Sequence, residues 1–246
     1  MSAAPDANAT TPDQPRADTR MTLILTAERI FAEEGISNTP LRRVTRAAGQ
    51  RNESAIHYHF GSREGVVGAI LEHRTSPINQ ARIRFLNRLR AATEGPLSSR
   101  DVAESLCGPL AEHLRNSGGE SYDMRFLGAL WLDQPMWRSF EGRGAEDMGL
   151  FMGLDALLES KPYLPRSVVR LRYRLAIQIS TYSMARLERI ACKHGPDFDW
   201  MRAEADIAGI VDALTAIFDA PISSPSVEAL RAAGAFGASG RDADAP

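Results

Sequence analysis

The sequence predicts an all-α protein with a small N-terminal helix-turn-helix domain and a larger C-terminal helical domain. Apolar residues recur with helical period through nearly all of the chain between residues 18 and 220. Neither strand-like alternation nor an Asn-Gly hairpin signal interrupts this pattern. Residues 39–64 hold two short helical patterns joined by a tight polar turn, and a third helical pattern follows directly.

The two ends of the chain differ in composition from its middle. Residues 1–17 are rich in Pro, Ala, Asp and Thr without periodicity, and they are predicted to be a disordered tail. Residues 221–246 are predicted to be a flexible tail with one short helical turn. Between the tails we expect two domains, 18–74 and 75–220.

Caps and breakers delimit four helices in the N-terminal domain. The expected N-caps are Thr39, Asn52 and Ser62, with Pro40 at the first position of the second helix. The expected stops are Gly35, Gly49, Gly61 and Pro77. The helices are therefore predicted at residues 18–34, 39–48, 52–60 and 62–74.

The same signals place six helices in the C-terminal domain, at residues 78–93, 99–116, 121–133, 144–160, 166–194 and 199–219. The middle of this series is interrupted by Pro135, Gly142 and Gly144. Both cysteines, Cys107 and Cys192, fall within helical patterns, so we expect inert core thiols in a reducing compartment.

Positive charge gathers in the short N-terminal motif. The whole chain carries a formal net charge of -2, whereas residues 39–64 hold five arginines against two glutamates, a local charge of +3. A nucleic-acid-binding surface is therefore expected to be local, and the rest of the protein is acidic.

The third predicted helix has two faces. At about 100° per residue, Phe60 lies about 40° from Ile56, so these two side chains are expected to be buried together. The opposite face and its flank carry the polar and aromatic residues Arg51, Ser54, His57, Tyr58 and His59. Such a stripe suits insertion into a DNA major groove. On spacing alone, an ordinary helical hairpin with a polar surface remains the alternative.

Helix starts supply a second kind of contact. The backbone amides at the Thr39 start, and those at Ser62 and Arg63, present donors and a positive dipole end. We expect these ends to bind phosphates and so to fix the register of the reading helix.

Residues 20–71 resemble the DNA-binding domain of TetR-family regulators. The resemblance rests on the ILTAERIFAEEG helix, the Thr39 start, Arg46-Ala47-Ala48-Gly49, Tyr58-His59-Phe60 and Ser62-Arg63-Glu64. It implies that Tyr58 and His59 lie at the DNA backbone, that Phe60 packs in the core and that Arg63 contacts phosphate.

The turn before the reading helix departs from the usual family pattern. Gly49 and Phe60 are one residue further apart than is common, and Gln50-Arg51-Asn52 replaces the frequent Val-Ser. The sequence therefore resembles a subgroup with a longer turn, in which the positions of Arg51 and Asn52 depend on how the outward stripe is rotated.

The resemblance also implies a homodimer in which the last two long helices form a four-helix bundle with their twins. The interface residues expected on these helices are Leu175, Ile179, Tyr182, Ile207, Ile210 and Leu214. A dimer suits two reading helices that must meet successive major grooves about 34 Å apart. Helical spacing alone equally allows these residues to be monomer core.

The middle helices are rich in Met and aromatic residues, most of which must be core. If the family pattern holds, some of them line a cavity for a largely apolar effector. The residues we assign to that cavity are Phe85, Leu106, Phe126, Trp131, Trp137, Phe151 and Met152.

Other chemistry finds little support in the sequence. On a helix, His57 and His59 lie about 200° apart and cannot chelate one metal ion. Neither a P-loop, a GxSxG elbow nor a GxGxxG after a strand occurs, so no metal, cofactor or catalytic site is predicted. No segment reaches the roughly 18 apolar residues of a membrane span.

These observations predict a cytoplasmic, sequence-specific DNA-binding regulator, specifically a ligand-responsive repressor that acts as a homodimer on a palindromic duplex operator. An all-α carrier or enzyme with an apolar pocket is the main alternative. A helical bundle that binds only other proteins is the third.

Overall fold

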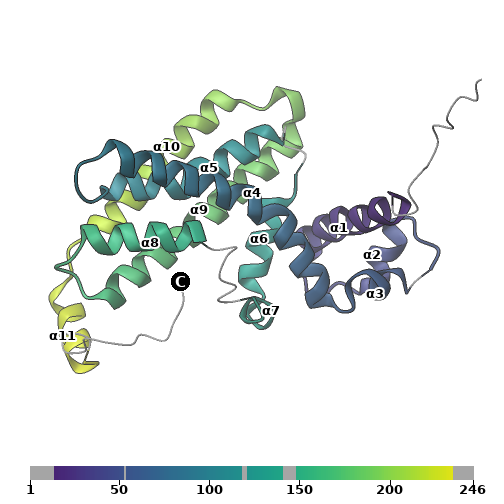
Figure 1. Cartoon of the computed structure of the whole chain (residues 1–246), viewed down its shortest axis with the longest axis horizontal. Helices are drawn as coiled ribbons and strands as arrows, with labels where there is room; N and C mark the ends of the chain where they lie inside the picture. Colours follow the sequence, from purple (N-terminus) through teal and green to yellow (C-terminus); the bar gives the residue numbers. More distant parts are fainter. Residues whose placement is uncertain (1–13, 53, 118–120, 141–147, 235–246) are drawn as a thin grey trace, which may run out of the picture.

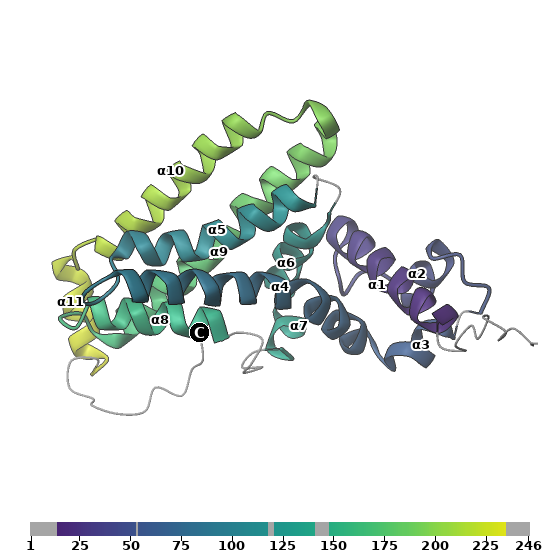
Figure 2. The same cartoon turned by 45° about the horizontal axis from the view of Figure 1, so that its top comes forward.

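The computed structural model describes residues 14–52, 54–117, 121–140 and 148–234. Every regular element among these residues is helical, which confirms the all-α prediction. The N-terminal helices form one end of the molecule and the long C-terminal helices the other (Figure 1). Helix α4 runs from one end to the other (Figure 2).

Three helices, α1 (Gln14–Glu34), α2 (Leu41–Ala47) and α3 (Ala55–Phe60), form the N-terminal unit. Helix α1 begins four residues before the predicted start at residue 18, so residues 14–17 are helical rather than part of a tail. The remainder of the predicted N-terminal tail lies outside the described residues. The three helices and the start of α4 bury one apolar cluster, which includes Ile24, Ile30, Phe31, Val44, Ile56, Val66 and Ile70.

Helix α4 (Arg63–Ala92) corrects a prediction, because Pro77 lies inside it and does not end it. Proline removes one backbone hydrogen bond and costs about 3 kcal/mol in a helix interior. Burial of Leu71 and Ile78 on either side of Pro77 favours continuation of the helix. The predicted boundary between residues 74 and 75 therefore falls inside one continuous helix.

The C-terminal helices follow the predicted ranges closely. They are α5 (Ser99–Asn116), α6 (Asp123–Leu132), α8 (Met148–Ser160), α9 (Arg166–His194) and α10 (Trp200–Asp219). The Gly142 and Gly144 interruptions, and the first residues of the helix predicted from 144, lie outside the described residues. Among the described residues no single helix has the length and apolar character to cross a bilayer, although α10 and the helix that follows it, bent by 59°, meet that measure as a pair.

Among the described residues, two short α-helices and the 3-10 helix η2 (Gly195–Asp197) were not predicted. Helix α7 (Gln134–Arg138) has Pro135 in its first turn, where proline is tolerated, and the Asp133 side chain accepts a hydrogen bond from the backbone N–H of Met136 at 3.3 Å. Helix α11 (Ser224–Ala232) replaces the single turn expected in the C-terminal tail. Its N-cap is Ser223, whose hydroxyl accepts from Ser226 N–H at 3.4 Å.

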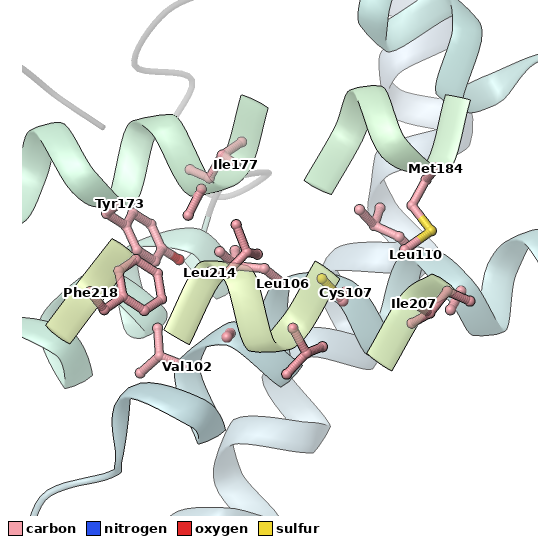
Figure 3. Close-up of a cluster of buried hydrophobic side chains, with 14 of the residues drawn as sticks. Val102, Leu106, Cys107, Leu110, Tyr173, Ile177, Met184, Ile207, Leu214 and Phe218 are labelled. Atoms are coloured by element: carbon pink, nitrogen blue, oxygen red, sulfur yellow. The ribbon is translucent and has the colours of Figure 1, made fainter. Parts of the chain in front are cut away.

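The C-terminal core lies between α5, α9 and α10 (Figure 3). The rings of Tyr173 and Phe218 stack with centroids 6.4 Å apart, and Leu214 is fully buried beside them. Cys107 belongs to this core, and burial raises the pKa of its thiol to about 12. The prediction for Cys192 was wrong, because that thiol is exposed.

The N-terminal unit is docked on α6 and α7 through a shared core. Phe126, Leu130, Met136 and Phe140 complete the apolar cluster of α1 to α4. The Asp133 carboxylate also accepts a hydrogen bond from the backbone N–H of Ser37 at 3.0 Å. Movement of the N-terminal unit is therefore coupled to α6 as well as to α4.

Truncation of Leu214 tests the placement of α10. Because this side chain has no exposed surface, Leu214→Ala should lower the free energy of unfolding by about 2–5 kcal/mol. Urea unfolding should give the same loss at two protein concentrations, since the side chain packs within one chain. The exposed neighbour Ala213→Ser is the control, and a loss below about 1 kcal/mol would place Leu214 outside the core.

Candidate nucleic-acid interface and internal cavity

Helix α3 presents the two faces that its sequence predicts. The Ile56 side chain is 1% exposed and packs in the N-terminal core, whereas Tyr58 is 71% exposed. Arg51, Ser54 and His57 are exposed as well. Phe60 is only half-buried, less than predicted, and the Arg20 guanidinium lies 5.3 Å from the centre of its ring.

The turn between α2 and α3 is shaped by Gly49 and Asn52. Gly49 has φ 70°, a left-handed conformation that other residues rarely adopt, so α2 ends there as predicted. The Asn52 side chain accepts a hydrogen bond from Ser54 N–H at 2.9 Å. Asn52 therefore stabilises the turn and does not cap the helix, because α3 begins only at Ala55, with Ser54 as its N-cap residue.

Thr39 does not have the predicted capping role. Its side chain is buried and its hydroxyl donates to the Gly35 carbonyl at 2.8 Å. The N-cap position of α2 is held by Pro40, without a side-chain cap. Arg63 reaches the same turn, where Nη1 donates to the carbonyls of Ile36 and, at 2.7 Å, Thr39. Both residues hold the turn between α1 and α2 in the free protein, and their contact with DNA stays a prediction.

The turn between α3 and α4 holds these two helices close together. The predicted cap is confirmed, because the Ser62 hydroxyl accepts from Gly65 N–H at 3.2 Å. A Cβ atom added at Gly65 would lie 1.9 Å from the Phe60 carbonyl oxygen. The close approach of the two helices therefore depends on glycine at position 65.

The two histidines of the stripe make local contacts with their own helix and its C-terminal turn. His57 Nδ1 lies 3.1 Å from the Gly61 carbonyl oxygen, and the His59 ring meets the Tyr58 ring edge-on, with centroids 5.2 Å apart. In the described part of the chain, no three His, Cys, Asp or Glu side chains are grouped as a metal site.

Two basic residues that the prediction did not assign lie on α2, the helix before α3. Arg42 and Arg46 are exposed one turn apart. Their i, i+4 spacing on a polar face was the available signal. They add positive charge of the kind that attracts phosphates next to the reading helix.

A cavity of about 110 Å³ lies between α4, α5, α6, α7, α8 and α9. The Trp131 and Trp137 rings stack beside it, with centroids 4.0 Å apart and planes at 21°. Its wall is mostly apolar, with Thr75, Asn79, Arg82, Ser180 and Thr181 as the polar groups. Their side chains come from two helices far apart in sequence, so spacing could not identify them.

Three of the seven predicted cavity residues line it, namely Leu106, Trp131 and Trp137. Phe126 lies fully buried in the N-terminal core instead. Phe85 is half-buried with the Arg88 guanidinium 6.0 Å from its ring centre. Phe151 and Met152 are half-buried on α8 and are not part of the wall.

The predicted interface residues divide between surface and core. On α9, Leu175, Ile179 and Tyr182 are 37% to 42% exposed. Leu171, which was not predicted, is 49% exposed and extends them into one apolar stripe. On α10, Ile207 and Leu214 are buried within the chain, and Ile210 is half-buried. Core packing in one chain therefore accounts for Ile207 and Leu214, whereas the place of Ile210 in an interface stays a prediction.

The exposed stripe of α3, held over one core by α1, α2 and the start of α4, defines a helix-turn-helix DNA-binding protein. Residues 23–70 match the family model described as "Bacterial regulatory proteins, tetR family". Residues 23–70 are therefore a TetR-family DNA-binding domain, which comprises most of the N-terminal unit and the start of α4, and the protein is a DNA-binding transcriptional regulator.

Solved structures of similar shape include regulators. NalD of Pseudomonas aeruginosa, the secondary repressor of the MexAB-OprM multidrug efflux pump, is 16% identical, with 80% of this chain and 95% of NalD covered and a TM-score of 0.49. SCO4942 of Streptomyces coelicolor is 18% identical, with 82% and 99% covered and a TM-score of 0.47. RolR, solved with resorcinol, is 20% identical, with 86% and 98% covered and a TM-score of 0.35. No curated protein matches the chain.

Tyr58 offers a direct test of the reading face. Because its side chain is largely exposed, Tyr58→Ala should abolish sequence-specific DNA binding and leave the unfolding midpoint unchanged. The binding target is a duplex selected by the wild-type protein from a random-sequence pool, and gel shifts at fixed salt measure the affinity.

Ile56→Ala is the matched variant on the buried face, and it should lower the free energy of unfolding by about 2–5 kcal/mol. Specific binding by Tyr58→Ala at wild-type affinity would show that α3 does not read DNA through this face.

Proposed function

We propose that the protein is a homodimeric, effector-responsive repressor that acts in the cytoplasm on a palindromic duplex operator. The observation that carries the proposal is the anchored helix α3, with Ile56 buried on one face and Tyr58 exposed on the other. A single helix of this length reads only a few base pairs, so a second copy is needed for a specific site.

The dimer is supported by the apolar stripe of α9. Leu171, Leu175, Ile179 and Tyr182 follow one another at helical spacing on an exposed face. Helix α10 contacts α9, and its exposed face carries the small residues Ala205, Ala208, Gly209 and Ala216. Small residues let a second helix approach closely while the stripe provides apolar area. A two-fold axis here gives the self-complementary interface of a cyclic dimer.

A charge placed in this stripe should separate the protomers. We expect Leu175→Glu to be a monomer by light scattering, because a carboxylate would lose its hydration inside the interface. The control is Leu132→Glu, which changes a leucine that is 75% exposed on α6, outside the stripe. An intact Leu175→Glu dimer would refute the proposed interface.

The effector response is supported by the walls of the cavity. Leu71, Thr75 and Ile78 of α4 line it, and the same helix begins at Arg63, just after the reading helix. A ligand that binds one position of α4 better than another shifts the population toward that position. The shift would change the separation of two reading helices in a dimer.

The size and lining of the cavity indicate the class of effector. About 110 Å³ beside two stacked indole rings suits a small planar aromatic molecule. The hydroxyls of Thr75, Ser180 and Thr181 can bind one or two polar substituents on such a ring.

Filling the cavity should remove the response. A small planar aromatic compound that raises the thermal midpoint of the wild type should release the selected duplex and relieve repression in a reconstituted transcription assay. Leu106→Phe should retain DNA binding but lose the thermal shift and the release, because the larger ring occupies the space. Leu89→Phe, on α4 outside the cavity wall, is the matched control. A full response by Leu106→Phe would place the effector elsewhere.

A further inference from the structure

Ionisable side chains from five helices meet where the N-terminal unit joins the C-terminal helices. Three of them are carboxylates that are at most 2% exposed, Glu28 of α1, Asp123 of α6 and Glu188 of α9. Two guanidinium groups, Arg74 of α4 and Arg125 of α6, lie among them. Buried charges of this kind are rare unless they are paired.

Arg74 pairs with both units at once. Its Nε and Nη2 donate to the two carboxylate oxygens of Glu28 at 2.8 and 2.7 Å. Its Nε also lies 3.0 Å from Asp123 Oδ1, an ion-pair contact. One guanidinium therefore links a carboxylate of the N-terminal unit to a carboxylate of the regulatory helices.

The neighbouring groups complete the surroundings of this cluster. Glu188 accepts from Arg125 Nε at 3.1 Å and from the Ser121 hydroxyl at 2.7 Å, so that pair is locally satisfied. His113 of α5 contacts Asp123 Oδ2 through Nε2. His73 of α4 is also close, and burial lowers its pKa. The positive charge of Arg20, on the same helix as Glu28, also lowers the pKa of His73.

We propose that Glu28, Arg74 and Asp123 are positioning residues for DNA reading, and that the docked arrangement holds one proton on the Glu28–Asp123 pair. The geometry supports it, because two buried carboxylates lie against one guanidinium and repel each other when both are ionised. The reading role rests on the function proposed above, whereas the proton and the docking are properties of the free protein.

The direction of the pH effect follows from Glu28. Burial raises the pKa of Glu28 to about 7, with the Asp123 charge adding to this effect and the Arg74 hydrogen bond opposing it. Asp123 differs, because the hydrogen bond with His113 and the charge of Arg74 outweigh burial and lower its pKa. A carboxyl group whose pKa is raised on folding stabilises the folded, docked state. Its full contribution is present at pH values below its pKa in the unfolded chain, and this contribution is lost as the pH rises through about 7.

Glu28→Gln tests the shared proton without DNA, because the glutamine side chain has nearly the same size and cannot ionise. The ratio of the Glu28→Gln folding constant to that of the wild type should rise about tenfold between pH 6 and pH 8 in urea unfolding. The matched control is Glu34→Gln, which removes a carboxylate from the same helix that pairs with Arg43 at the surface of the N-terminal unit. Its ratio to the wild type should stay level over the same range.

Parallel pH curves for Glu28→Gln and the wild type would overturn the shared proton. If Glu28→Gln does not fold, Asp123→Asn provides a second test, because loss of the neighbouring charge should lower the pKa of Glu28 and move the pH dependence to lower pH than in the wild type. An Asp123→Asn profile identical to that of the wild type would equally overturn the shared proton.

Arg74 tests the positioning. Hydrogen exchange in residues 23–34 should rise at least tenfold in Arg74→Met and be partly restored in Arg74→Lys, which keeps the charge but cannot fork between two carboxylates. Equal exchange in Arg74→Met and the wild type would overturn the role.

The DNA measurement separates this proposal from the function on which it rests. The affinity of the wild type for its selected duplex should change with pH between 6 and 8, and that of Glu28→Gln should not, beyond the drift shared with Glu34→Gln. The same pH dependence of DNA affinity in Glu28→Gln and in the wild type would overturn the positioning role. Failure of the wild type to bind any duplex would instead overturn the proposed function, with the unfolding and exchange results unaffected.

Discussion

The burial of Ile56 beneath α3 is the contact on which the DNA-reading surface depends. A helix of six residues is too short to be stable alone, so its orientation is set by the core below it. With Ile56 fixed, helical geometry turns Tyr58 and His57 outward. The short turns on both sides, at Gly49 and at Gly61 with Ser62, then limit how far the helix can rotate.

The continuity of α4 gives this surface a mechanical connection to the rest of the molecule. The helix starts just after the reading helix α3, carries Arg74 at the junction and then contributes Thr75 and Ile78 to the cavity wall. Side chains of α6 and α7 enter the core of the N-terminal unit as well. A displacement at the cavity therefore has two packed routes to α3, through α4 and through α6.

The sequence predicted the helices where local signals and tertiary packing agree. Helices α5 and α9 match their predicted ranges, because apolar periodicity and the stops beyond them are strong. The prediction that Pro77 ends a helix was wrong, because burial around Pro77 outweighs the lost hydrogen bond. Thr39 and Asn52 have good capping side chains, but tertiary and turn geometry direct them to Gly35 and Ser54. The reading face was predictable because it lies on one helix, whereas the cavity wall and the Arg74 cluster bring together residues distant in sequence.

The most direct test of the account is hydrogen exchange across the whole chain, measured with and without the selected duplex. If α3 reads DNA, the duplex should slow exchange across residues 51–63 and the first turn of α4, and leave α11, at the opposite end of the molecule, unchanged (Figure 1). Protection confined to the C-terminal helices, with none at α3, would contradict it.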